Sequence, residues 1–428
     1  TRTCSVYSVL EVVLMRDFAI CCVGGGSSLK ILLITPLYPG YLNQSKLDAT
    51  YAVHYIAREW AKNHQVKVLR PWPCYPGLFS LFLKDQKMHH YKSEEKFFLD
   101  GVEIIRAPIT KLPAMDYSDM QIKRVAHKFV QNLDKTEYPD MIVCDTLNPS
   151  IYIGKIIADK CNSPLVASLH NTDIKYLSKG KHYKRYISVD DRVNRIVFRS
   201  RKIEKEFIRL YQGKKKHEEY FYVPFGINKG DVISKDRLME KIDRPSKTIV
   251  VAASLKRLKK IDVLIDAFAG IQKRNGYVLK IIGDGPERNR LERQVANLGL
   301  ESCVYFEGEK AREQVLHLME ESDIFVLVSS PETFGLVYVE AMAKGCITIG
   351  SKGEGIDGVI VNNENGYLCT PGNAGELQLA LEQAMNLNRA ERKRLIDSAL
   401  DTAKRLNYED LAERYLQNLR ELSGSGSR

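Results

Sequence analysis

Short runs of apolar residues alternate with stretches of helical periodicity along most of the chain. In the first half, the apolar runs are residues 30–35, 65–69, 102–108, 141–145 and 165–170. Between these runs, apolar residues recur at helical spacing over residues 49–63, 117–134 and 150–160. This alternation predicts a repeated strand–helix unit, which builds a mostly parallel sheet with helices on both faces.

The second half of the chain repeats the same alternation. Its apolar runs are residues 248–254, 277–283, 304–308, 323–329 and 347–351. Between the two halves, residues 222–232 contain one proline and two glycines, a composition that predicts a linker or hinge. The predicted fold class is α/β, with two Rossmann-like domains, residues 29–225 and 226–406, facing each other across a cleft. Ligands of such sheets bind beyond the carboxyl ends of the strands.

Both ends of the chain have the composition of added linkers. Residues 24–28 read GGGSS and residues 423–428 read SGSGSR. Glu11 and Asp17 interrupt the apolar run before the first linker, which argues against a secretory signal and against a membrane-spanning helix. We therefore expect residues 1–28 to be a leader and linker, with a native amphipathic leader as the alternative, and residues 423–428 to be a tag remnant.

Length and composition indicate a globular protein of two domains. The chain has 428 residues, of which 44% are hydrophobic, and both values are ordinary for a folded protein of this size. Its nine cysteines show neither a CxxC motif nor the spacing of zinc ligands. We expect these cysteines to be reduced and the protein to be cytoplasmic.

The net charge of +11 is concentrated in the first half of the chain. Residues 29–228 carry 33 basic and 21 acidic side chains, and residues 175–216 alone carry 15 basic and 4 acidic ones. Such a segment forms either a solvated helical surface or a surface that attracts an anionic partner. A membrane or a lipid phosphate is favoured over nucleic acid, because no nucleic-acid-binding motif accompanies the charge.

The glycine pattern argues against a dinucleotide-dependent oxidoreductase. Such an enzyme needs GxGxxG after its first strand, whereas residues 35–43 contain only Gly40. A second glycine-containing turn, residues 281–288, follows a predicted strand and opens a predicted helix. Its residues Gly283, Asp284 and Gly285 form either a tight turn or a ligand contact.

Residues 330–345, with the sequence SPETFGLVYVEAMAKG, follow the buried run 323–329. Apolar residues at helical spacing predict a helix that begins near Gly335 and ends at Gly345. The amides of about residues 334–337 would then lack acceptors within the helix. A helix end of this kind attracts phosphate through its free N–H groups and the positive pole of the helix dipole.

Two carboxylates flank this helix start. Glu340 lies about one turn into the helix, and its side chain is expected to lean back toward the same end as Glu332. Carboxylates repel phosphate but accept hydrogen bonds from hydroxyl groups, so the combination suits a nucleotide sugar. The alternative is that Glu332 caps the helix and Glu340 is a solvated helix residue.

The spacing of these glutamates resembles the E-x7-E signature of retaining GT-B glycosyltransferases, specifically glycosyltransferase family 4, also called group 1. Four further segments resemble that family in order and spacing: residues 254–268, 281–288, 353–369 and 407–422. The last of these resembles the family's closing helix, which packs back on the first domain. The resemblance covers most of residues 29–422, and its second half is the more specific part.

The resemblance implies a role for each matching residue. It implies that Glu340 binds the ribose hydroxyls, that Glu332 binds a hydroxyl of the donor sugar and that Lys259 neutralises the departing diphosphate. His170 matches the family histidine that faces the donor sugar. The catalytic residues implied are His170, Glu332 and Lys259. The donor-binding residues implied are Glu340, Phe334, Gly335, Leu336, Val337, Arg257, Gly40, Gly283, Asp284 and Gly285.

The sequence departs from the family pattern at two places. The family often has Gly-Arg-Leu before the lysine, whereas this chain has Ala253, Ser254 and Leu255, so Arg257 is the nearest substitute for the usual arginine. The first loop offers Gly40 where the family often has two adjacent glycines. These departures leave open how the diphosphate is held.

The resemblance implies transfer of a sugar, with retention of configuration, from a nucleotide sugar to a glycan or a lipid-linked acceptor. A UDP-sugar is the favoured donor, and surface polysaccharide, glycolipid or glycoprotein glycan is the expected product. No DxD triplet occurs, so we expect no metal and no cofactor. The basic segment 175–216 suggests peripheral attachment to the inner face of a membrane. The alternatives are a GT-B sugar-nucleotide epimerase and a non-catalytic nucleotide-sugar-binding protein, while a PLP-dependent phosphorylase is disfavoured by chain length.

Overall fold

The structure is a computed structural model that describes residues 28–42, 44, 51–75, 95–112, 115–213, 215 and 217–424. Nearly all of the expected leader and most of the expected tag remnant therefore lie outside the described residues. Across these described ranges, none of the helices combines the length and the apolar character needed to cross a bilayer.

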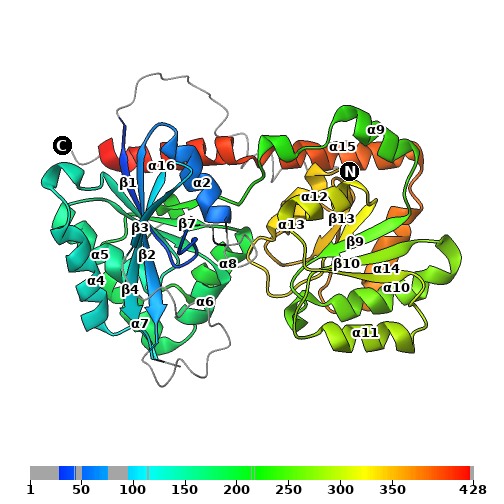
Figure 1. Cartoon of the computed structure of the whole chain (residues 1–428), viewed down its shortest axis with the longest axis horizontal. Coiled ribbons are helices and arrows are strands. Elements are labelled where there is room, and N and C mark those ends of the chain that lie inside the picture. The colour runs from blue at the N-terminus through cyan, green and yellow to red at the C-terminus, as the bar shows by residue number, and fades with distance from the viewer. Residues whose placement is uncertain are drawn as a thin grey trace, which may run out of the picture.

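The first domain is built on an eight-stranded sheet in the order β3-β4-β2-β1-β5-β6-β7-β8 (Figure 1). Its strands are β1 (Lys30–Ile34), β2 (Gln65–Cys74), β3 (Glu95–Leu99), β4 (Val102–Thr110), β5 (Met141–Asp145), β6 (Leu165–Leu169), β7 (Arg195–Phe198) and β8 (Tyr220–Tyr222). All neighbours pair in parallel except β3 and β4. The antiparallel strand β3 was not predicted.

The second domain is built on a six-stranded parallel sheet in the order β11-β10-β9-β12-β13-β14. Its strands are β9 (Thr248–Ala252), β10 (Val278–Ile282), β11 (Val304–Gly308), β12 (Ile324–Val326), β13 (Ile347–Ser351) and β14 (Tyr367–Cys369). Each strand except β14, which was not predicted, begins within a predicted apolar run, because strands covered on both faces need continuous apolar sequence. The two sheets confirm the predicted α/β class with two Rossmann-like units.

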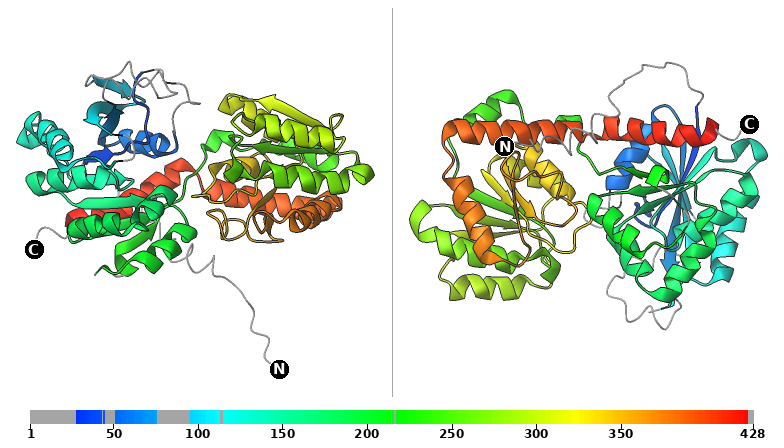
Figure 2. Two further views of the ribbon diagram at one scale, coloured as in Figure 1. Left: turned by 90° about the horizontal axis from the view of Figure 1, so that it is seen from below. Right: turned by 180° about the vertical axis from the view of Figure 1, so that it is seen from behind.

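Helices cover both faces of each sheet (Figures 1 and 2). Those of the first domain are α2 (Ala52–Ala61), α4 (Asp119–Gln131), α5 (Ser150–Cys161), α6 (Asn171–Leu177), α7 (Gly180–Asp190) and α8 (Arg201–Leu210). Alternate residues of β1 enter different cores: Ile31 and Leu33 pack on the side of α2, whereas Leu32 and Ile34 pack on the side of α4 and α5. This division follows from the alternating direction of side chains along a strand.

The helices of the second half are α9 (Lys235–Asp243), α10 (Ile261–Asn275), α11 (Arg288–Asn297), α12 (Arg312–Glu320), α13 (Leu336–Ala343), α14 (Ala374–Met385) and α15 (Arg389–Arg405). The final helix, α16 (Tyr408–Gly424), returns to the first domain and lies beside α2 (Figures 1 and 2). The indole Nε1–H of Trp60 on α2 donates to the carbonyl of Ala412, 2.9 Å away. The rings of Trp60 and Tyr415 pack edge to face, 5.0 Å apart.

The chain therefore passes between the two domains twice, and the two crossings lie side by side. Ile227, in the first crossing, donates its N–H to the carbonyl of Leu406 in the second. Tyr408 donates its N–H back to the carbonyl of Ile227. A β-carbon at Gly226 would overlap the backbone of Leu406, so this close approach requires glycine.

Candidate active site

A cavity of about 750 Å³ lies between the two domains at the carboxyl ends of their strands. Its lining brings together His170 from the first domain with Lys259, Glu332 and Glu340 from the second. The other predicted donor-binding residues in the lining are Phe334, Gly335, Leu336, Val337, Gly283 and Asp284. The place of the cavity is the one expected for ligands of two such sheets.

Helix α13 begins directly after Gly335, as the sequence predicted. Gly335 adopts a φ of 79°, and a β-carbon at this position would overlap the ring of Tyr338. Glycine is therefore required for the turn that starts the helix. Leu336 and Val337 line the cavity, so the start of α13, with its unpaired amides, faces the space where a ligand would lie.

Glu332 lies in the loop before α13 and is held by two donors. The ammonium group of Lys259 lies 2.7 Å from Glu332 Oε2, and the hydroxyl of Ser329 donates to the same oxygen over 2.9 Å. The N-cap residue of α13 is Gly335, and the Glu332 carboxylate is hydrogen-bonded to Lys259 and Ser329 instead of to the first amides of the helix. Two residues with predicted roles are thus in direct contact.

The loop that carries Glu332 is fixed in turn by Glu354. Its carboxylate accepts hydrogen bonds from the Ser330 hydroxyl and from the backbone N–H of Glu332, each 2.7 Å long. Lys202, on α8 of the first domain, lies 2.7 Å from the same carboxylate. Neither Glu354 nor Lys202 was predicted, and their contact ties the loop to the opposite domain.

Glu340 is buried, which excludes the interpretation of a solvated helix residue. Its Oε1 accepts a hydrogen bond of 2.7 Å from Arg312 Nε, and Arg312 Nη2 lies 2.7 Å from Asp231 Oδ2. Burial raises the pKa of Glu340, and the charge of Arg312 acts in the opposite direction. Arg312 was not predicted, although it opens α12 directly after a strand of the same sheet.

His170 follows β6 and is held by a carboxylate from the neighbouring strand. Its Nε2 lies 3.1 Å from Oδ1 of Asp145, the last residue of β5, and Arg199 Nη2 lies 2.8 Å from the same oxygen. Burial alone would raise the pKa of Asp145, but His170 and Arg199 outweigh burial and hold that pKa well below its usual range. Asp145 and Arg199 therefore fix the orientation of the histidine ring.

A second acid fixes the backbone of the same loop. Asp173 accepts hydrogen bonds of 2.8 Å from the N–H groups of Leu147 and His170. Burial raises the pKa of Asp173 to about 6, although His170 and the two hydrogen bonds act against the increase. The turn that presents His170 thus depends on two buried acids that sequence reasoning did not identify.

Three predicted donor-binding residues do not line the cavity. The side chain of Arg257 is 85% exposed, with its nearest acid, Glu287, 3.6 Å away. Gly40 packs against the ring of Trp72, and a β-carbon at Gly285 would crowd the backbone of Leu255, so both glycines serve close packing. The cationic side chains that do line the cavity, within the described residues, are Lys259, Lys310 and Arg312.

No cluster of three or more histidine, cysteine, aspartate or glutamate side chains suited to a metal ion occurs among the residues that the structure describes. Independence from metals and cofactors stays a prediction.

Two mostly parallel sheets with a cavity at the carboxyl ends of their strands have the GT-B fold. The family model described as "Glycosyl transferases group 1" matches residues 233–401, which form most of the second domain.

Three relatives are similar to this chain, and two of them are named as glycosyltransferases. N-acetyl-alpha-D-glucosaminyl L-malate synthase of Bacillus anthracis is 35% identical over 158 residues, which are 36% of this chain and 41% of that protein. The uncharacterized glycosyltransferase MJ1178 of Methanocaldococcus jannaschii is 25% identical over 366 residues, which are 80% of this chain and 95% of that protein. Lipopolysaccharide core biosynthesis glycosyltransferase LpsE of Rhizobium meliloti is 30% identical over 193 residues, 44% of this chain and 54% of that protein.

Solved structures with this fold cover nearly the whole chain. Sucrose-phosphate synthase of Thermosynechococcus elongatus has a TM-score of 0.70 and 20% identity, covering 92% of this chain and 99% of that one. Anabaena Alr3699/HepE in complex with UDP has a TM-score of 0.66 and 20% identity, covering 92% of this chain and 100% of that one. At this level of identity, the likeness establishes the fold.

Proposed function

We propose that this protein is a retaining glycosyltransferase that moves a sugar from a nucleotide sugar, with UDP-sugars favoured, to a glycan or a lipid-linked acceptor. The observation that carries the proposal is the single cavity that brings together Glu332, Glu340, Lys259 and His170. Structures of HepE with UDP and with UDP-glucose support a UDP-sugar in a cavity of this fold.

In this proposal the donor spans the start of α13. The diphosphate lies near the first amides of α13 and near Lys259, where both the helix dipole and the ammonium group favour negative charge. The ribose hydroxyls donate to Glu340, and a sugar hydroxyl donates to Glu332. Lys310, which lines the cavity and lies 3.1 Å from Glu307, is a further cation for the diphosphate in place of the absent arginine.

The chemistry follows from where charge develops. As the bond between the sugar and the diphosphate breaks, negative charge builds on the diphosphate, and a cation fixed beside it lowers the barrier. The acceptor hydroxyl attacks from the same face, and its proton passes to a phosphate oxygen of the departing diphosphate. This route retains the anomeric configuration and needs neither an enzyme nucleophile nor a metal ion.

The contact between Lys259 and Glu332 is central to this arrangement. In the structure the two side chains are 2.7 Å apart, so a bound diphosphate would share Lys259 with Glu332. Lys259→Ala should therefore depress turnover strongly, by about a hundredfold or more if it removes one transition-state contact. Glu340→Ala should mainly weaken nucleotide-sugar binding, because its partner is the ribose and not the reacting bond.

The decisive experiment incubates the protein with UDP-, GDP- and ADP-sugars, with and without a lipid-linked acceptor, and measures free nucleoside diphosphate and the anomeric configuration of the product. Transfer with retention, lost in Lys259→Ala, is the expected result. An inverted product would overturn the retaining mechanism, and unchanged kinetics in both variants would overturn the site. Interconversion of the donor without acceptor would indicate an epimerase instead, and binding without turnover a nucleotide-sugar-binding protein.

We further propose that the acceptor is presented at an anionic membrane surface on the cytoplasmic side. Relatives named for lipopolysaccharide core biosynthesis and for alpha-monoglucosyldiacylglycerol synthesis support a lipid-linked acceptor. Part of the charge of residues 175–216 is internal, because Arg199 is buried and Lys202 contacts Glu354. Lys181, Lys184 and Lys205 are exposed and remain for such a surface.

Vesicles containing anionic lipid test this attachment. We expect binding at low salt that weakens as the salt concentration rises, because exposed charges are screened over about 10 Å at 0.1 M salt. Replacing Lys181 and Lys184 by glutamate should reduce binding while leaving the affinity for UDP unchanged. Absence of binding at low salt, or binding that is indifferent to salt, would contradict the proposal.

A further inference from the structure

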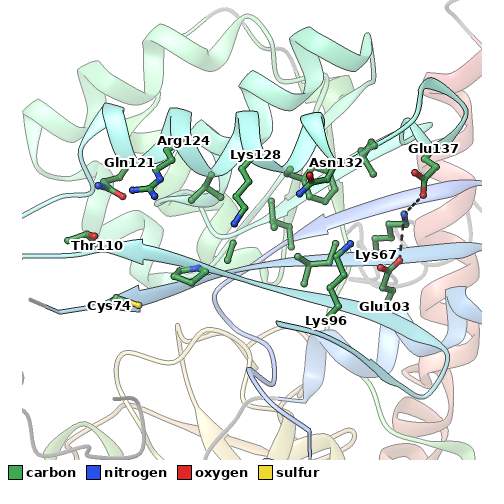
Figure 3. A pocket seen from close by; sticks show the side chains of 17 residues that line it. Lys67, Cys74, Lys96, Glu103, Thr110, Gln121, Arg124, Lys128, Asn132 and Glu137 are labelled. Carbon is green, nitrogen blue, oxygen red and sulfur yellow. Dashed lines mark hydrogen bonds and ion pairs between the residues drawn. The ribbon is translucent and has the colours of Figure 1, made fainter. Parts of the chain in front are cut away.

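A second cavity, of about 610 Å³, lies in the first domain between α4 and the sheet (Figure 3). Its cationic side chains are spread along its length, with Arg124 at one end and Lys96 toward the other. At the cavity between the domains, in contrast, Arg312 contacts two carboxylates directly, those of Asp231 and Glu340. Interacting charges that are concentrated at one cavity are typical of a functional site.

The guanidinium of Arg312 is oriented by Asp231. Its Nη2 donates to Asp231 Oδ2 over 2.7 Å and its Nη1 donates to Asp231 Oδ1 over 3.4 Å, so the carboxylate grips the guanidinium at two points. Burial would raise the pKa of Asp231, but the hydrogen bond and the charge of Arg312 outweigh burial and lower it. The side chains of Asp231 and Arg312 are only 15% and 19% exposed, so solvent screens this contact weakly.

Arg312 uses only one oxygen of Glu340. Its Nε donates to Oε1 over 2.7 Å. Within the part of the chain that the structure describes, Oε2 of Glu340 accepts no hydrogen bond, and Glu340 lines the cavity. The two oxygens of a carboxylate share one rigid plane, so the contact at Oε1 also sets where Oε2 points. Arg312 therefore determines how Glu340 meets a ligand hydroxyl.

Asn228, in the first crossing, connects Asp231 to the first domain. Its Nδ2 and its backbone N–H donate to Asp231 Oδ2 over 3.2 Å and 3.1 Å. Its Oδ1 accepts a hydrogen bond of 2.8 Å from Nη2 of Arg58, on α2. A guanidinium can only donate and an ionised carboxylate can only accept, so this orientation of the amide is the one that satisfies both neighbours. The amide of Asn228 thus joins an arginine of the first domain to the acid that orients Arg312.

Tyr55, also on α2, provides a second link between the first domain and Arg312. Its ring lines the cavity, and the Cζ atom of Arg312 lies 5.9 Å from the ring centroid. The Cζ atom of Arg58 lies 5.2 Å from the same centroid. Both distances are within the range of a cation–π interaction. Helix α2 therefore contacts Arg312 directly through Tyr55 and indirectly through Arg58.

We propose that Asp231, Asn228 and Arg58 are positioning residues for the nucleotide-sugar donor. They act through Arg312 to fix the direction of Glu340, and they thereby strengthen its hydrogen bonds with the ribose hydroxyls. This role rests on the proposed binding of ribose by Glu340. Its consequence is that the affinity for the ribose depends on a helix of the first domain and on the segment that crosses between the domains.

Calorimetric titration with UDP and with dideoxy-UDP, which lacks both ribose hydroxyls, separates the ribose contacts from the other contacts of the nucleotide. Wild type should bind UDP about tenfold more tightly than dideoxy-UDP, as expected for hydrogen bonds to a charged group. In Asp231→Asn, the affinity for UDP should fall about tenfold and the affinity for dideoxy-UDP should hardly change. Arg58→Met and Asn228→Ala should show the same selective loss, of about threefold, because they act at one further remove. Arg58→Lys, which keeps a donor for Asn228, should restore part of the affinity.

Lys229→Met is the matched control, because Lys229 lies in the same crossing but contacts Asp410, 3.4 Å away, instead of Asp231. It should bind both nucleotides like the wild type. Arg58→Met lies outside the second domain and provides the test if Asp231→Asn fails to fold. An equal loss of affinity for UDP and dideoxy-UDP, or a wild-type ratio of the two affinities in both variants, would overturn the positioning role alone. A wild type that binds none of UDP, GDP and ADP would overturn the proposed function as well.

Discussion

Two buried carboxylates, Glu340 in the lining of the cavity and Asp145 behind His170, are positioned by arginines that are distant in sequence. Arg199 holds Asp145, and Arg312 holds Glu340. A guanidinium has a rigid set of donors, so it fixes the direction of the carboxylate as well as compensating its charge. Because Asp145 contacts His170, each arginine determines how one predicted site residue is presented.

Asp145→Asn should destabilise the protein by about 3–5 kcal/mol at pH 7, because Arg199 is left with an uncompensated buried charge. The lowered pKa of Asp145 means that its carboxylate contributes stability above the unfolded pKa of about 3.9 and loses it as the pH falls through the lower folded pKa. The difference from wild type should therefore shrink below about pH 4. Urea unfolding at several pH values measures this, and a difference that stays constant to pH 3 would contradict the assignment.

Arg312→Ala should make donor binding depend on pH. Burial already raises the pKa of Glu340, and removing Arg312 removes the charge that opposes the increase. In the variant, Glu340 should be ionised only at higher pH, so the affinity for UDP should rise more steeply from pH 5 to pH 8 than in wild type. Arg312→Lys, which keeps the charge, is the control. Parallel pH profiles for wild type and Arg312→Ala would count against Glu340 as a hydroxyl acceptor.

At the scale of elements, the loop between β12 and α13 depends on one carboxylate. Glu354 contacts the loop at Ser330 and Glu332 and contacts Lys202 on α8. It does not line the cavity, so it acts as a positioning residue for Glu332. Small displacements of a positioned group can cost about a hundredfold in rate.

Glu354→Gln should lower kcat by about tenfold or more while leaving the affinity for UDP nearly unchanged, because Glu332 is proposed to contact the sugar and not the nucleotide. Lys202→Met should likewise lower kcat while leaving the affinity for UDP nearly unchanged. Lys202→Arg should restore part of the rate. Glu206→Gln is the control, since Glu206 lies 3.7 Å from Lys202 but does not contact the loop. An equal loss of UDP affinity and kcat would instead indicate general disruption of the loop.

Features that depend on the local sequence pattern could be predicted from the sequence. The parallel strands follow from apolar runs, and the start of α13 follows from Gly335 and the helical spacing after it. The hairpin between β3 and β4 was missed, although Asp100 and Gly101 both have positive φ and form an Asp-Gly turn, a common hairpin signal. The signal was present, but the strand beside it is only five residues long.

What depends on distant contacts could not be predicted. Arg199 reaches Asp145 across 54 positions, and Arg312 reaches Glu340 across 28. Arg257 was predicted to share the role of Lys259 because the two residues are close in sequence. Lys259 lines the cavity and Arg257 does not. Both residues lie in the 3₁₀ turn η5 (Arg257–Lys259), where three residues complete a turn, so residues two positions apart point in different directions.

At the scale of the whole molecule, α16 fastens the end of the chain to the first domain through Trp60. Trp60→Ala removes a buried ring and the hydrogen bond to Ala412, so it should cost about 3–5 kcal/mol of stability. Leu379→Ala, at an exposed position of α14, is the control and should cost little. Hydrogen exchange should be faster in α2 and α16 of the first variant, and unchanged protection of both helices would contradict this role.

The two crossings between the domains restrict how the domains can move. Ile227 in the first crossing is hydrogen-bonded to both Leu406 and Tyr408 in the second. The two crossings are therefore joined side by side and can serve as one hinge. We expect a bend of the domains about this hinge to preserve both hydrogen bonds of Ile227. A rotation of one domain against the other would break them. Opening of the cleft would also separate Lys202 from Glu354, so this contact and the two crossings together restrict the separation of His170 from Glu332.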